Sequence, residues 1–112
     1  METVVKSHRP RTSAVLTFLD DAYPAMAPTP ENYALLAQLD QASRDLGCAE
    51  ITAFHPRGRG AGDISLVSPP LGGLDGLGLG GEGEHATHET ASIARAPELV
   101  KRSALLIYRL TR

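Results

Sequence analysis

Residues 29–54, TPENYALLAQLDQASRDLGCAEITAF, predict a helix, a tight turn and a strand in that order. Thr29 can cap the helix and Pro30 suits its first position. The apolar residues of this helix fall on one stripe at helical spacing: Leu35, Leu39, Ala42 and Leu46. Gly47 suits the left-handed conformation that ends a helix, and residues 49–54 read as a strand. A helix, turn and strand in this order indicate an α/β unit.

On the N-terminal side of this unit, residues 12–18 alternate apolar and polar side chains, which predicts a second strand. Residues 1–11 are basic and resemble the end of a helix stopped by Pro10. Residues 19–30 contain three prolines, which resist both helices and central strands. We therefore expect residues 19–30 to form a hinge between two structural units.

On the C-terminal side, residues 55–62 predict a loop and residues 63–67 a short helix or strand that ends at the two prolines of positions 69–70. A brief strand is plausible over residues 74–77. A last helix is expected to begin near Pro97. One face of this helix carries Leu99, Ser103, Leu106 and Leu110.

The composition limits the classes of function. The 112 residues are 42% hydrophobic but only 4% aromatic, so the core should be small and aliphatic. A net charge of −2 gives no drive toward nucleic acid or an anionic membrane. The single cysteine, Cys48, excludes an internal disulfide and favours the cytoplasm. No apolar run has the length of a membrane-spanning helix.

A glycine-rich run over residues 74–85, LDGLGLGGEGEH, delivers one histidine. Glycines allow a backbone to approach a ligand closely, and neutral imidazole is the commonest protein ligand for a transition metal. His85 is therefore the leading metal-ligand candidate. Zinc needs three or four ligands, and the chain offers only weak further candidates: Asp63, Asp75 and Glu84. His88 could join His85 only on a shared helical turn, against which the glycines argue; His55 and His8 are expected in solvent.

The segment Arg57-Gly58-Arg59-Gly60-Ala61-Gly62-Asp63 places two cations on a glycine-rich turn. Its backbone N–H groups could hold an anion, or the segment could be a solvated loop. It is not a P-loop, because no Gly-Lys-Ser/Thr follows.

Taken together, these motifs resemble the C-terminal end of a family of zinc-dependent carboxypeptidases and deacylases. The family includes glutamate carboxypeptidase, aminoacylase, acetylornithine deacetylase and succinyl-diaminopimelate desuccinylase, and the glutamate carboxypeptidase-like branch is most similar. The resemblance covers nearly the whole chain. It rests on the run over residues 74–85 and on three further segments: YPAMAPTPEN (23–32), GAGDIS (60–65) and KRSALLIYRL (101–110).

The resemblance implies the C-terminal portion of an α/β, phosphorylase/hydrolase-like catalytic domain, preceded by the last strand of a ferredoxin-like lid that often carries the dimer contact. Residues 1–18 would end the lid, 19–30 form the hinge, and 31–112 belong to the catalytic domain. In that family two zinc ions promote hydrolysis of an amide bond in a peptide or N-acyl amino acid. His85 matches a zinc ligand, and Gly60, Gly62 and Asp63 match a substrate-side loop.

Nothing in residues 1–84 resembles the His-x-Asp and Glu-Glu motifs that supply the family's other zinc ligands and its general-base glutamate. We therefore expect a C-terminal fragment that is inactive alone and associates with the remainder of the enzyme or with itself. The alternative is a non-catalytic remnant, or a small interaction domain that binds a partner through its apolar helices.

Overall fold

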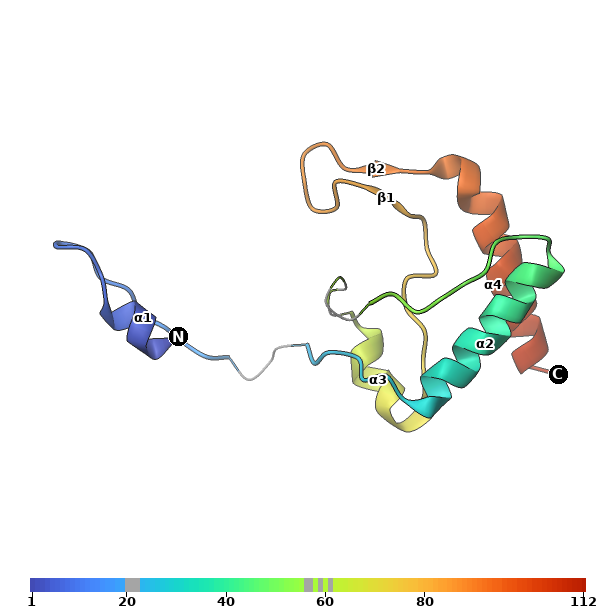
Figure 1. Ribbon diagram of the computed structural model, residues 1–112, viewed down its shortest axis with the longest axis horizontal. Coiled ribbons are helices and arrows are strands. Elements are labelled where there is room, and N and C mark those ends of the chain that lie inside the picture. The colour runs from blue at the N-terminus through green and yellow to red at the C-terminus, as the bar shows by residue number, and fades with distance from the viewer. Residues whose placement is uncertain (20–22, 56–57, 59, 61) are drawn as a thin grey trace.

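The computed structural model describes residues 1–19, 23–55, 58, 60 and 62–112. Residues 1–19, here called the tail, project away from residues 23–112, here called the body (Figure 1). The tail contains the short helix α1 (Glu2–Lys6) and is otherwise drawn-out chain. The radius of gyration is 19.4 Å, against about 13 Å for a compact domain of this size. The tail accounts for much of this elongation, because it makes the longest extent 63 Å.

Helix α2 (Pro30–Asp45) forms where the sequence predicts it. The Thr29 hydroxyl accepts a hydrogen bond from the Asn32 backbone N–H at 3.2 Å, which satisfies one of the free donors of the first turn. After the helix, Gly47 adopts a φ of +71°, the left-handed conformation expected of a residue just beyond a helix end.

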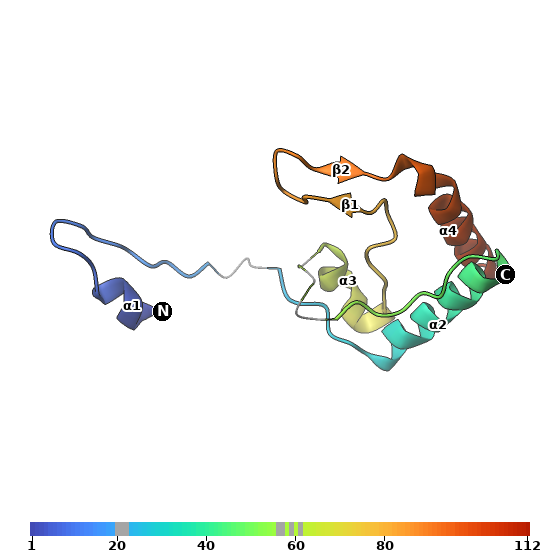
Figure 2. The same ribbon diagram turned by 45° about the horizontal axis from the view of Figure 1, so that its top comes forward.

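The last helix, α4 (Ala96–Leu110), is preceded by a 3-10 turn at Ile93–Arg95 and packs beside α2 (Figures 1 and 2). The buried hydrophobic residues of the described chain all come from these two helices: Leu39, Ala42, Leu99 and Leu106. Arg102 and Ser43 are also buried between them, with the Arg102 guanidinium 3.3 Å from the Ser43 hydroxyl and 3.3 Å from Glu98. The core is thus small and aliphatic, as the composition predicts, but it includes a buried cation.

Helix α3 (Ile64–Leu71) settles the choice left open for residues 63–67 in favour of a helix. The helix does not end at the prolines, as the sequence suggested, because the fixed φ of proline is itself helical. Its last turn closes when the Gly72 N–H donates to the Ser68 carbonyl at 2.7 Å.

Asn32 ties the start of α2 to the chain on either side of it. Its side-chain amide donates to the Ala27 carbonyl at 2.7 Å, and its oxygen accepts from the Gly73 N–H at 2.8 Å. Asn32 is 6% exposed, so both bonds are shielded from water. The turn after α3 is therefore fixed against the N-terminus of α2.

The strands predicted over residues 12–18, 49–54 and 74–77 do not form in the described part of the chain. A strand needs neighbours for its backbone groups, and here none of these segments pairs with another. The strands that do form, β1 (Gly81–Glu82) and β2 (Thr90–Ala91), make an antiparallel hairpin in which Gly81 lies opposite Ala91. The secondary structure of the described chain is a mixture of helix and strand. The parallel sheet of an α/β catalytic domain stays a prediction.

We predict that replacing Asn32 with Ala lowers the free energy of unfolding by about 1–3 kcal/mol, because the buried Gly73 N–H loses its acceptor. Urea unfolding followed by circular dichroism measures this change. Gln38→Ala is the matched control, since Gln38 is an exposed position of the same helix and should change stability by less than about 0.5 kcal/mol. Equal unfolding midpoints for the two variants would show that the Asn32 bonds carry no stability.

Candidate functional site

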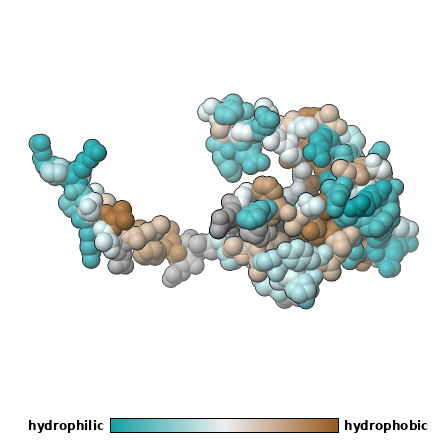
Figure 3. All heavy atoms as spheres, viewed as in Figure 1, coloured by the Kyte–Doolittle hydropathy of each residue, from teal (hydrophilic) through white to brown (hydrophobic). Residues whose placement is uncertain are grey.

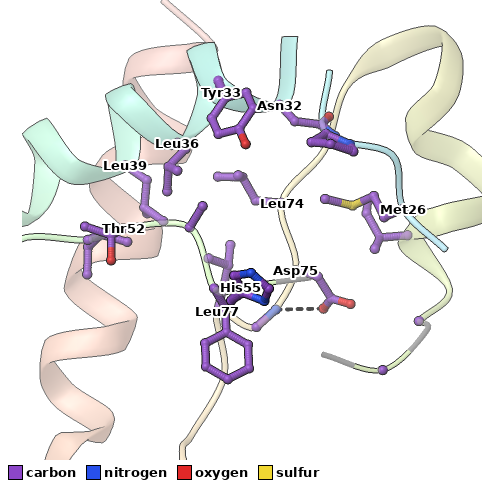
Figure 4. A pocket seen from close by; sticks show the side chains of 18 of the residues that line it. Met26, Asn32, Tyr33, Leu36, Leu39, Thr52, His55, Leu74, Asp75 and Leu77 are labelled. Carbon is purple, nitrogen blue, oxygen red and sulfur yellow. Dashed lines mark hydrogen bonds between the residues drawn. The ribbon is translucent and has the colours of Figure 1, made fainter. Parts of the chain in front are cut away.

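A partly open cleft of about 960 Å³ lies between α2, residues 51–55 and residues 74–77. Figure 4 shows Leu36 and Leu39 of α2 pointing toward Leu74 across it. The lower part is more polar, because the carboxylate of Asp75 and the imidazole of His55 lie there. The cleft has the size of a ligand pocket, with mainly apolar walls and a few polar groups at one end.

Side chains of α2 fix the wall formed by residues 49–54. The Asp40 carboxylate accepts from the Ile51 N–H at 2.8 Å, and the Ser43 hydroxyl donates to the Ala49 carbonyl at 2.7 Å. The Ile51 N–H and, next, the Arg44 guanidinium 2.8 Å away lower the pKa of Asp40 below its ordinary value. Beyond these anchors, the backbone groups of residues 52–54 make no hydrogen bond with any described residue.

Two of the three predicted substrate-side residues, Gly60 and Gly62, line the cleft. Gly62 lies so close to Asp75 that a Cβ there would be 2.5 Å from the Asp75 carboxylate. Its carbonyl accepts a hydrogen bond from the Ser65 hydroxyl at 2.6 Å, which fixes it to the first turn of α3. Asp63 is exposed at the start of α3 and does not cap that helix with its side chain. The loop and Asp75 thus meet, although they are distant in sequence.

The anion-site hypothesis depends on Arg57 and Arg59, which lie outside the described residues. Gly58 and Gly60 of the same loop are described, and a Cβ at Gly58 would be 2.9 Å from the Phe54 ring. The anion-site hypothesis therefore stays a prediction.

His85 lies in the turn that joins β1 to β2, and its side chain is exposed. Its φ of +64° is uncommon for a residue with a Cβ and costs some backbone strain. The Glu89 carboxylate accepts the His85 backbone N–H at 3.3 Å, which stabilises the turn. His88 follows in the same turn, and the ring of His88 occupies the space that a Cβ at Gly83 would need. As the glycines suggested, the two histidines do not share a helical turn.

Zinc is the metal that the resemblance implies, and the donors among the described residues do not complete a site for it. The described residues contain no group of three or more His, Cys, Asp or Glu side chains that could hold a metal ion. In both ribbon views the hairpin that carries His85 lies apart from α3, which follows Asp63 (Figures 1 and 2). Among the described residues, His85 therefore has no further donors grouped with it.

No protein-family model, curated protein or solved structure matches this chain. Within the described residues, no helix has the length and apolar character needed to cross a bilayer.

Sequence reasoning did not identify the cleft or the groups that hold its walls. Asp40 and Ser43 belong to no sequence motif, and Arg102 lies within the segment 101–110 without an assigned role. The available signal was their position beside the apolar faces of the helices. Asp40 follows Leu39, Ser43 follows Ala42, and Arg102 precedes Ser103 on the apolar face of α4. Glu89 follows His85 by four residues in the sequence, which is the span of their hydrogen bond.

We predict that acid weakens the attachment of the cleft wall. The folded-state pKa of Asp40 lies below its unfolded value of about 3.9, so its stabilisation is complete above that pH and is lost as the pH falls through the folded value. Asp40→Asn keeps an oxygen acceptor for Ile51 but does not titrate. Below about pH 4 the unfolding free energy of the wild type should therefore fall more steeply than that of Asp40→Asn.

Urea unfolding between about pH 2.5 and 6 measures the slopes. Asp63→Asn is the control and should follow the wild-type curve, because the exposed Asp63 side chain makes no hydrogen bond to any described residue. Parallel curves for the wild type and Asp40→Asn would contradict the assignment.

Proposed function

We propose that this chain is the C-terminal part of a zinc-dependent metallopeptidase or deacylase that hydrolyses an amide bond of a peptide or N-acyl amino acid. In this proposal His85 is one zinc ligand, and Gly60, Gly62 and Asp63 belong to the substrate side of the site. The general base and the other ligands come from the remainder of the enzyme. A cytoplasmic location is part of the same proposal.

The observation that carries the proposal is the local setting of His85. A glycine-rich run leads into a hairpin whose turn holds this histidine in a positive-φ conformation, with its imidazole exposed. Strained backbone is concentrated at functional sites, where it aims a side chain at a ligand. Gly81 is required for this hairpin, because a Cβ there would collide with the Thr90 carbonyl. The turn thus presents His85 outward to donors on another surface.

The incomplete core supports the fragment hypothesis. Four hydrophobic side chains are buried in the described residues, while large ones such as Ile107 (61% exposed) and Val100 (66%) face solvent on α4. Apolar surface of this kind marks a contact with another polypeptide. It also favours the second candidate, a non-catalytic module that binds a partner through its apolar helices.

The decisive experiment translates the DNA that lies immediately upstream of the coding segment for this chain. The proposal predicts that it encodes His-x-Asp and Glu-Glu motifs and that the joined polypeptide binds two zinc ions and hydrolyses N-acyl amino acids. His85→Ala in that polypeptide should lower kcat/KM at least about 100-fold, since a zinc ion stabilises the transition state by several kcal/mol. Zinc content by mass spectrometry should fall in parallel.

His88→Ala is the matched control, because His88 is exposed in the same turn, and it should retain zinc and most activity. An upstream frame without these motifs, or equal effects of the two substitutions, would contradict the proposal and leave the binding module.

A further inference from the structure

The strand-like half of the tail has no partner in the structure. Residues 13–19 make no hydrogen bond with any described residue. Val15 is 90% exposed, Phe18 68% and Leu19 70%. Figure 3 shows apolar atoms, in brown, along the part of the tail that lies nearer the body. This apolar, alternating segment therefore has the sequence of a strand but no strand partner among the described residues.

One wall of the cleft, in turn, lacks a neighbouring extended segment. Residues 52–54 present backbone N–H and C=O groups that are unpaired within the described chain. Leu36, Leu74 and Leu77 supply the apolar wall beside them. Residues 52–54 are exposed, and an unpaired segment beside an apolar surface is a template for strand addition. The cleft therefore fits an extended segment whose side chains are apolar on one face.

We propose that the cleft is the docking site for residues 13–19 of a second copy of this chain, so that two chains form a symmetric dimer by exchanging tails. Ala14, Leu16 and Phe18 enter the cleft, and the backbone of residues 13–19 pairs with residues 52–54. The inference goes beyond the proposed function, since it concerns association of the chain itself and requires no zinc.

Charge complementarity favours this occupant. Residues 1–19 carry three basic side chains and one acidic, a net charge of +2, while residues 20–112 carry eight basic and twelve acidic, a net charge of −4. Asp75 lies at the polar end of the cleft, where its carboxylate accepts the Gly76 N–H at 2.7 Å and retains further acceptor capacity. Arg102 also lines the cleft, but its guanidinium is paired with Glu98, whereas Asp75 makes no ion pair with a described residue. Arg9 and Arg11 immediately precede the docking segment, so a tail in the cleft brings these cations to an acidic body.

The geometry favours a second copy over the chain's own tail. Tyr23 and Met26 line the cleft, and the tail lies away from the body in both ribbon views (Figures 1 and 2). Leu19 is only four residues before Tyr23, so the same chain would have to reverse at the rim of its own cleft. Exchange of identical elements between two chains avoids this reversal and is a low-cost route to a dimer.

Sedimentation velocity over a range of concentrations tests the proposal on the full chain, with zinc absent. The wild type should be a dimer that dissociates on dilution. Leu16→Glu in the tail and Leu77→Glu in the cleft should each raise the dimer dissociation constant at least about tenfold, because each places a charge in the apolar contact. The matched controls are Val15→Glu, on the opposite face of the tail, and Leu79→Glu, which is 45% exposed and outside the cleft.

A mixture of Leu16→Glu and Leu77→Glu chains separates tail exchange from any other dimer. The intact tail of Leu77→Glu can enter the intact cleft of Leu16→Glu, so the mixture should associate more tightly than either variant alone. Circular dichroism spectra that match the wild type exclude unfolding as the cause of dissociation. A wild-type monomer at all concentrations, a dimer indifferent to Leu16→Glu, or a mixture that does not recover would each overturn the proposal.

Discussion

The body depends on hydrogen bonds that polar side chains of α2 make to other segments. Asn32 bonds the chain before α2 and the turn after α3, and Asp40 and Ser43 bond the wall of the cleft. Ser43 also receives the Arg102 guanidinium from α4, near the centre of the small core. The turn after α3 and the wall of the cleft therefore take their position from α2 through hydrogen bonds, whereas α4 also packs on α2 through the hydrophobic core. Such bonds contribute only about 1 kcal/mol net each, but leaving a buried partner unpaired costs more than the bond gives.

This construction explains why the cleft stays open. Hydrogen bonds fix residues 49–51 to α2 at two points, and the backbone groups of residues 52–54 that follow make no hydrogen bond with any described residue. The segment is held close to an extended path without being part of a sheet. A hydrophobic core would close such a space by collapse, whereas directional bonds hold its walls apart. The cleft is thus a consequence of how the body is held together.

Local signals made the helices partly predictable, whereas the β1–β2 hairpin was not predicted. The Thr29 hydroxyl caps the start of α2 and the left-handed Gly47 follows its end, and both residue types can be recognised in the sequence. The strands over residues 12–18 and 49–54 had the right periodicity but depend on neighbours that no periodicity guarantees. Burial of Arg102 could not be predicted, since its partners Ser43 and Glu98 converge on it only after α4 packs against α2. At the candidate site, residue type alone pointed to His85. The close approach of Gly62 to Asp75 could not be predicted, because it depends on tertiary structure.

The two proposals make competing demands on one surface. Residues 52–54 can pair with only one extended segment on their open edge, so a strand supplied by the remainder of an enzyme and the tail of a second copy exclude each other. In a complete enzyme the covalently linked strand has the advantage of a high effective concentration, and residues 13–19 would be retained in the preceding domain. The isolated chain has no such competitor, and the same unpaired backbone groups then favour the nearest suitable strand, which every copy carries. If the proposed function holds, tail exchange is the behaviour expected of this chain in the absence of the rest of the enzyme.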